Sequence, residues 1–165
     1  MGGRIVVPAY LENLSIVSDF VQEQARAIHL PSRKTWELLL VMDEICSQII
    51  QYMDFDQQMG SIGISWENNP EFVTLTVEAN GLPFNPLDVN KYNSESESEE
   101  QTLGGMGIYL VSKMVDGVHY ERCGNSNVLK IVKYRRTYRK NGASKEATDA
   151  CPKNCNSRKK AQQNS

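Results

Sequence analysis

The sequence predicts an α+β fold, a two-layer α/β sandwich in which a mostly antiparallel sheet is covered on one face by three helices. Apolar residues recur every three or four positions in two long segments near the N-terminus, as they do in amphipathic helices. Further along the chain, apolar and polar residues alternate in short segments, as they do in half-buried strands. Clusters of Asn, Gly and Pro separate these segments and predict turns.

The first third of the chain is expected to contain one strand and two helices. Residues 4–7 form the strand, which Pro8 ends. The apolar stripe of the first helix, which ends at Pro31, is Leu14, Val17, Val21, Ala25 and Ile28. Ser32 is the expected N-cap of the second helix, which extends to about Met53. The expected buried stripe of this second helix is Leu39, Met42, Cys46, Ile49 and Met53.

Two hairpins and a third helix are expected in the remainder of the domain. The strands of these hairpins are residues 62–66, 73–77, 118–122 and 128–134. The turn cluster 67–70 joins the first pair of strands, and Gly124-Asn125 joins the second pair. Between the hairpins lie an acidic run, 94–100, which predicts a solvated segment, and a short helix after Gly107.

Length and charge limit the class of protein. The 165 residues are enough for one domain, which we place at 1–137, and the polar composition of 138–165 predicts a basic, disordered tail. Residues 1–132 contain eight Lys and Arg against eighteen Asp and Glu, whereas residues 133–165 contain ten against two. An acidic body argues against a nucleic-acid-binding domain, and the tail alone has the charge to contact an anionic partner. The longest apolar run, 38–42, is far shorter than the roughly 20 residues that span a bilayer, so we expect a cytoplasmic protein.

Several kinds of catalytic site are excluded because their motifs are missing. The chain has no G-x-x-x-x-G-K-[ST] phosphate loop, no H-E-x-x-H and no G-x-S-x-G. Cys151 and Cys155 lack a second pair of Cys or His nearby, so a zinc site is not expected. Cys46 and Cys123 are interpreted as core or loop thiols.

Three stretches of the sequence remain as candidate functional sites. On the second helix, Glu44 and Gln48 are four residues apart and share one face, where a carboxylate and an amide can together activate a hydroxyl and ligate a cation. A solvated helix face is the alternative interpretation. The second stretch, residues 77–86, ends a strand with a turn that contains Gly81. The third, residues 103–111, places glycines before a helix, where backbone N–H groups can bind an anion; a hinge explains it equally well.

In this order, the three stretches resemble the ATP-binding boxes of the GHKL superfamily, whose Bergerat fold is shared by histidine kinases, chaperones and gyrase. The resemblance is carried by Asp43 to Ile50, Glu78 to Pro86 and Gly104 to Val111, and it covers roughly residues 4–134. The family pattern in these places is E-A-x-x-N, V-x-D-x-G-x-P-F-x-P and G-G-x-G-L-x-L-V. A short chain without a phosphoacceptor-histidine domain is most similar to the anti-sigma factor serine/threonine kinases.

The resemblance implies a site for ATP and Mg²⁺. Glu44 takes the place of the catalytic glutamate that activates the attacking hydroxyl, and Gln48 takes the place of an asparagine that ligates Mg²⁺. The residues implied in ATP binding are Gln48, Asn80, Gly81, Gly104, Gly105, Met106 and Gly107. Residues 87–102 take the place of a flexible lid over the nucleotide.

Three positions depart from the family pattern. Gln48 is longer than asparagine by one methylene, which displaces its amide oxygen by about 1.5 Å, and Mg²⁺ demands near-ideal octahedral geometry. Ala79 replaces the aspartate that accepts a hydrogen bond from the adenine amino group, a loss of about 1.5–3 kcal/mol. Lys130 aligns with the hydroxyl residue that supports this aspartate. Two functions therefore stay open: a kinase, or a pseudokinase binding module that no longer uses ATP.

The same resemblance implies the partners of this chain. Such proteins are homodimers that bind a sigma factor and release it when a STAS-domain anti-anti-sigma protein competes. The kinases among them phosphorylate this antagonist on serine. We therefore expect a regulator of transcription that acts through proteins, with no direct contact to nucleic acid or to a membrane.

Overall fold

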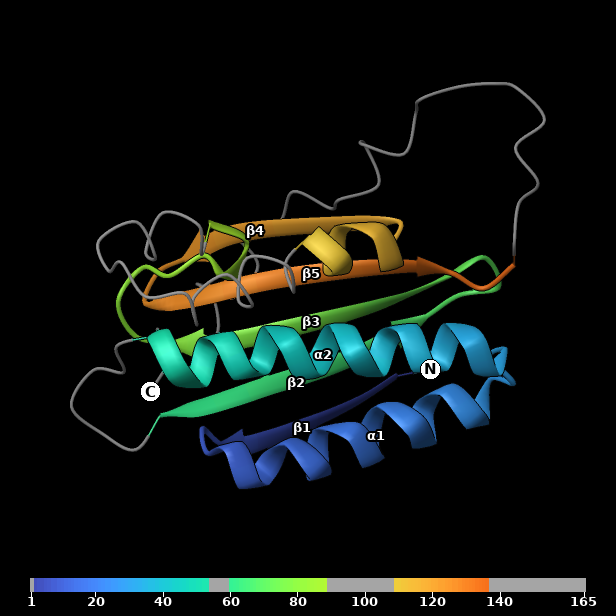
Figure 1. Cartoon of the computed structure of the whole chain (residues 1–165), viewed down its shortest axis with the longest axis horizontal. Helices are drawn as coiled ribbons and strands as arrows, with labels where there is room; N and C mark the ends of the chain where they lie inside the picture. The colour runs from blue at the N-terminus through green and yellow to red at the C-terminus, as the bar shows by residue number, and fades with distance from the viewer. Residues whose placement is uncertain (1, 54–59, 89–108, 137–165) are drawn as a thin grey trace, which may run out of the picture.

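The computed structural model describes residues 2–53, 60–88 and 109–136 (Figure 1). The elements in chain order are β1 (Gly2–Pro8), η1 (Leu11–Asn13), α1 (Leu14–Ala27), α2 (Ser32–Tyr52), β2 (Ser61–Asn68), β3 (Phe72–Asn80), η2 (Pro86–Asp88), β4 (Gly117–Cys123) and β5 (Ser126–Tyr134). Residues 109–114 are also helical. The expected α+β class and the expected sequence of strands and helices are confirmed.

The five described strands form one antiparallel sheet in the order β1-β2-β3-β5-β4. Side chains alternate between its two faces, so the buried residues of β3 are every second one, from Val73 to Ala79. Trp66, Leu75 and Ile131 are paired across β2, β3 and β5, and each is at most 1% exposed. This row forms part of the core between the sheet and the helices.

Helices α1 and α2 lie side by side over one face of the sheet (Figure 1). The predicted Ser32 cap is wrong by one residue, because Ser32 is the first helical residue and Pro31 occupies the N-cap. The backbone of Pro31 has a ψ of 139°, and its carbonyl accepts the first helical hydrogen bond from the Thr35 amide. The predicted stripe of α2 is also shifted at one position: Leu38 is buried, whereas Leu39 is half-buried.

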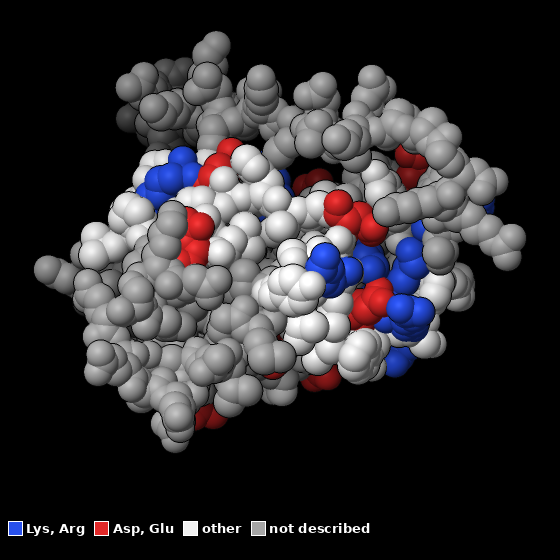
Figure 2. Space-filling model, turned by 45° about the horizontal axis from the view of Figure 1, so that its top comes forward, with Lys and Arg blue, Asp and Glu red and all other residues white. Residues whose placement is uncertain are grey.

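Oppositely charged side chains are mixed on the described surface. On the face drawn in Figure 2, Lys and Arg lie beside Asp and Glu rather than in one uninterrupted basic patch. Three of the ion pairs are Arg4–Glu78 at 2.8 Å, Lys130–Glu121 at 3.0 Å and Arg33–Glu37 at 3.1 Å. Among the described residues, no helix has both the length and the apolar character needed to cross a membrane.

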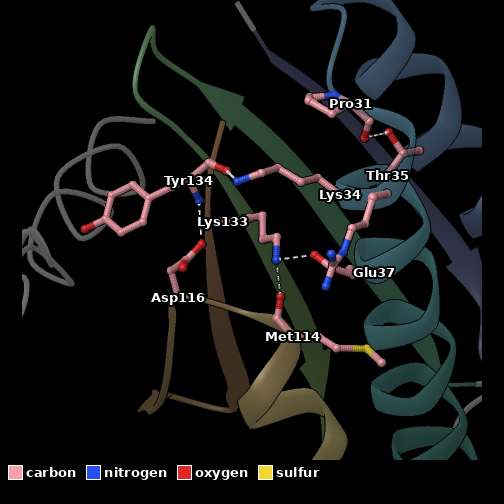
Figure 3. A network of polar contacts seen from close by, with 9 residues as sticks. Pro31, Lys34, Thr35, Glu37, Met114, Asp116, Lys133 and Tyr134 are labelled. Carbon is pink, nitrogen blue, oxygen red and sulfur yellow. Dashed lines mark hydrogen bonds and ion pairs between the residues drawn. The ribbon is translucent and has the colours of Figure 1, made fainter. Parts of the chain in front are cut away.

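A buried lysine on β5 connects three elements (Figure 3). The side chain of Lys133 is 9% exposed, its Nζ lies 2.5 Å from Glu37 Oε2 on α2, and it also donates to the Met114 carbonyl. Beside it, Lys34 Nζ donates to the Tyr134 carbonyl at 2.6 Å. These contacts fix the N-terminal half of α2 and the end of the 109–114 helix against β5.

Ionisation of Glu37 is part of this connection. Burial raises the pKa of Glu37, but the hydrogen bonds and positive charges of Lys133 and Arg33 outweigh it, so the net pKa lies below the usual value. Burial, together with the charge of Lys133, lowers the pKa of Lys34. The carboxylate of Glu37 is therefore ionised at neutral pH and neutralises the buried ammonium.

We expect Lys133→Met to lower the free energy of unfolding by about 3 kcal/mol, because it leaves the Glu37 carboxylate without its main partner. The double variant Lys133→Met/Glu37→Leu should recover most of this loss, since apolar side chains can replace a buried ion pair. Urea denaturation measures both. The control is Arg33→Ala, which should cost only about 0.5 kcal/mol because the side chain of Arg33 is 88% exposed. If the double variant instead lost as much free energy of unfolding as Lys133→Met and Glu37→Leu lose in sum, Lys133 and Glu37 would not be coupled.

We also expect the stability of the domain to fall as the pH is lowered through the folded-state pKa of Glu37. Because this pKa is lower in the folded than in the unfolded chain, its contribution is complete above the unfolded value and disappears in acid. Unfolding free energies measured between neutral and acidic pH should decline less steeply in Glu37→Gln than in the unchanged chain. Equal slopes would show that Glu37 contributes nothing to the pH dependence.

Candidate functional site

The two candidate residues on α2 are directly hydrogen-bonded. Gln48 Nε2 donates to Glu44 Oε1 at 3.0 Å, as expected for residues one helical turn apart. Gln48 is only 5% exposed and Glu44 is half-buried. The pair therefore faces inward, and the interpretation as a solvated helix face does not hold for Gln48.

The amide oxygen of Gln48 has no hydrogen-bond partner in the part of the chain that the structure describes. Among the described residues, nothing donates a hydrogen bond to Gln48 Oε1, although this atom is buried. A buried amide oxygen without a donor is unfavourable by about 1–3 kcal/mol. It also fits a Mg²⁺ ligand, because Mg²⁺ prefers oxygen and usually takes few protein ligands beside water and phosphate. Gln48 would hold the ion, and the described part of the chain contains no cluster of three His, Cys, Asp or Glu that could do so instead.

The cysteine beside this pair is not a nucleophile. Cys46 is fully buried on α2, and burial, aided by the charge of Asp43, raises the pKa of its thiol to about 12. The thiol is therefore protonated at neutral pH. This confirms the expectation of a core thiol for Cys46, whereas the expectation of a thiol at Cys123 is wrong, because Cys123 is disulfide-bonded. Glu44 is left as the candidate base on α2.

The strand-end turn after β3 is held by the hairpin of β4 and β5. The Gly81 amide donates to the Asn125 carbonyl at 3.1 Å. Gly81 has a φ of 155°, a backbone angle that residues other than glycine rarely adopt. Asn80 Oδ1 accepts from Ser126 Oγ at 2.5 Å. Since Asn80 follows buried Ala79 on the strand, its side chain lies on the opposite face of the sheet from α2. The structure thus does not bring the Asn80 side chain together with Gln48.

Asn127 on β5 also forms hydrogen bonds with the turn. It is a buried residue that was not predicted from the sequence. Its Oδ1 accepts from the Phe84 amide at 2.9 Å and from Tyr120 Oη at 2.7 Å. Its Nδ2 donates to the Leu82 carbonyl at 2.8 Å and lies 3.6 Å from Met53 Sδ. The available signal was a polar residue in phase with the buried apolar residues Leu129 and Ile131 of the same strand.

The contact with Met53 brings the end of α2 to the strand-end turn. Gln48 precedes Met53 by five residues, which corresponds to about 7.5 Å along a helix axis. The Glu44–Gln48 pair and the strand-end turn therefore lie at the same end of the sheet. They come from distant parts of the sequence. The third predicted stretch, with Gly104, Gly105, Met106 and Gly107, lies outside the described residues, as do residues 89–102 of the expected lid and the tail 138–165.

The alignment of Lys130 with a supporting hydroxyl is wrong. Lys130 pairs with Thr76 rather than with Ala79, and its Nζ bonds Glu121 Oε1 at 3.0 Å. The residue of β5 directly across from Ala79 is Asn127. The error arises because the phase of β5 along β3 is set by strand pairing, which a single sequence does not specify.

Residues 7–133 match the family described as the histidine kinase-like ATPase domain. Since this match spans well over half of the chain, the chain belongs to that family. The GHKL assignment is thereby confirmed at the level of the superfamily. Membership of the anti-sigma factor subgroup stays a prediction.

Two solved structures are also similar. The catalytic domain of histidine kinase ThkA is 13% identical, with a TM-score of 0.46, and the match covers 81% of this chain and 97% of that chain. Acinetobacter baumannii histidine kinase AdeS is 13% identical, with a TM-score of 0.44, over 82% of this chain and 68% of that chain. At this identity they add nothing about the chemistry of the site. No relative was found among curated proteins.

We expect Asn127→Ala to lower the free energy of unfolding by about 3 kcal/mol, because it leaves the buried Phe84 amide and the Leu82 carbonyl without their partners. Urea denaturation measures the loss, and hydrogen exchange at the Phe84 amide should accelerate. The neighbouring Ser126→Ala removes one hydrogen bond on the other face and should cost about 1 kcal/mol or less. Equal losses in the two variants would contradict the role assigned to Asn127.

Proposed function

We propose that this chain is an anti-sigma-factor-like regulatory protein whose GHKL domain binds a Mg²⁺–nucleoside triphosphate, ATP by family resemblance, between α2 and the strand-end turn. The observation that carries the proposal is the Glu44–Gln48 pair, hydrogen-bonded and directed inward from α2. Its proximity to the turn around Gly81 supports a site to which both contribute, because Met53 at the end of α2 contacts Asn127, which holds that turn.

The two residues of the pair have different roles in this proposal. Glu44 is half-buried, so a substrate hydroxyl can reach its carboxylate, which accepts the proton as the hydroxyl attacks. Gln48 Nε2 holds the carboxylate of Glu44 in place, and the amide oxygen, which has no donor among the described residues, would ligate the metal. A bound Mg²⁺ would offset the negative charge of the phosphates.

The partners in this proposal follow from the family resemblance. The acceptor hydroxyl is a serine of a STAS-domain anti-anti-sigma protein, and the regulated partner is a sigma factor, bound by a homodimer of this chain. The opening Val7-Pro8-Ala9, followed by Leu11 to Leu14, supports the assignment to this subgroup.

A second candidate function is a pseudokinase, a binding module that keeps the fold without using ATP. One specific observation favours it. Ala79 offers no acceptor for the adenine amino group, and the amide of Asn127, directly across from it, is already bonded to the protein through both of its polar atoms. The strand-end turn is therefore held without a ligand.

Nucleotide binding separates the two functions. We expect millimolar Mg²⁺–nucleoside triphosphate to raise the melting temperature, since a ligand of the native state stabilises it by mass action. Glu44→Gln should leave this shift intact and reduce phosphoryl transfer or hydrolysis by about 10²–10⁴-fold. The matched control is Asp43→Asn, which removes the exposed carboxylate next to Glu44 and should retain activity. Gln48→Leu, which removes the amide oxygen, should abolish the part of the thermal shift that requires Mg²⁺.

The outcomes are distinct. Binding without turnover in the unchanged chain supports the pseudokinase, and binding with turnover that depends on Glu44 supports the kinase. No thermal shift and no heat of binding with any nucleoside triphosphate would exclude the kinase and support a binding module that does not use ATP.

A further inference from the structure

Helix α2 has a second apolar stripe in addition to the one that is buried against the sheet. The buried stripe begins at Leu38 and ends at Ile49. Trp36 and Leu40 are one helical turn apart and lie on the side of α2 opposite Leu38, where they are 56% and 39% exposed. Leu39, beside them, is half-buried. Apolar stripes on helices face other parts of a protein, so this second stripe is a candidate contact surface.

The second stripe borders a groove between α1 and α2, which lie side by side (Figure 1). The groove has a volume of about 470 Å³, and its apolar lining consists of Leu30, Trp36 and Leu39. Leu40 continues the apolar surface along α2 beyond the groove. Because the apolar surface is longer than the groove, it suits a segment of a protein better than a compact small molecule.

The charge at this groove is positive. Arg26 on α1 is exposed and is the charged residue of the lining. In the part of the chain that the structure describes, no carboxylate lies within ion-pair distance of its guanidinium. Arg33 is 88% exposed at the same end of α2, and its partner Glu37 also neutralises Lys133, so these three side chains carry a net positive charge. A carboxylate beside apolar side chains would complement this surface.

We infer that the groove between α1 and α2 is a docking surface for an acidic amphipathic helix of a partner protein. Ser32, at one end of the lining, and Leu40 are eight residues apart, which corresponds to about 12 Å of helix, or about two turns. A partner helix with apolar residues three and four positions apart packs them along Trp36, Leu39 and Leu40, and its carboxylates face Arg26. This inference goes beyond the proposed function and does not depend on nucleotide binding.

The test titrates the full chain with two synthetic helical peptides of equal length. Both have leucine at every third or fourth position, and the remaining charged positions are glutamate in one peptide and lysine in the other. The chain has two tryptophans, and Trp66 is 1% exposed, so a change in emission reports on Trp36. We expect the glutamate peptide to shift this emission to shorter wavelength, because it excludes water from the indole. By calorimetry, its dissociation constant should be at least about fivefold lower than that of the lysine peptide.

Two variants test the apolar stripe and the charge separately. Trp36→Ala should weaken binding by about thirtyfold, since a tryptophan in a groove is typical of the residues that dominate an interface. Its control is Tyr52→Ala, an aromatic residue of α2 that is 47% exposed outside the groove and should change the affinity by less than about twofold. Arg26→Glu should reverse the preference between the peptides.

The control for Arg26→Glu is Lys113→Glu, which makes the same change of charge at an exposed lysine of the 109–114 helix and should retain the preference. This control is needed because residues 133–165, with ten Lys and Arg against two Asp and Glu, also attract an acidic peptide. A preference that Arg26→Glu does not alter, or that Lys113→Glu also reverses, overturns the role of Arg26.

The remaining outcomes also decide the inference. Binding of neither peptide, or binding that Trp36→Ala leaves unchanged, overturns the docking surface. Equal affinity for both peptides overturns the acidic character of the partner. If the Trp36 emission depends on protein concentration without peptide, a second copy of the chain covers the surface and the proposed occupant is wrong. All of these results leave the proposed function standing, and the titrations of the unchanged chain are decisive if a variant fails to fold.

Discussion

The geometry of the candidate site depends on one buried amide. Asn127 on β5 contacts the strand-end turn through Leu82 and Phe84, β4 through Tyr120, and the end of α2 through Met53. Buried polar groups are tolerated only when they are satisfied, and an amide with two lone pairs and two N–H groups can satisfy several elements at once. Without this residue, three parts of the chain would each present an unsatisfied polar group or a less well packed end.

Helix α2 is fixed to the sheet near both of its ends by contacts of different kinds. In its N-terminal half, Glu37 forms a buried ion pair with Lys133 of β5, and the same ammonium binds the carbonyl of Met114 (Figure 3). At its C-terminal end, Met53 packs against Asn127. Glu44 and Gln48 lie between these two contacts. A carboxylate and an amide that must act on a reacting group need such fixed support, because small displacements reduce catalysis.

The two halves of the candidate site differ in their chemistry. The half on α2 retains a carboxylate next to a buried amide oxygen, the combination suited to a hydroxyl and a metal ion. In the half at the strand end, Ala79 has no side-chain hydrogen-bonding group, and the amide of Asn127, across from it on β5, is bonded to the protein. Arg122, the cross-strand partner of Asn127 on β4, has a buried N–H group without an acceptor among the described residues. Membership of the family therefore does not by itself determine the chemistry of this half.

The sequence by itself determined the type and order of the described helices and strands, because apolar periodicity and turn residues are local signals that one chain displays directly. It also determined the candidate role of Glu44 and Gln48, whose four-residue spacing on a helix requires no tertiary information. Only the tertiary structure decided that Gln48 is buried, that Asn127 rather than Lys130 lies across from Ala79, and that Arg122 shares their face. The reason is physical: a shift of one residue in strand register exchanges the two faces of the sheet, and this register is set by packing between residues far apart in the chain.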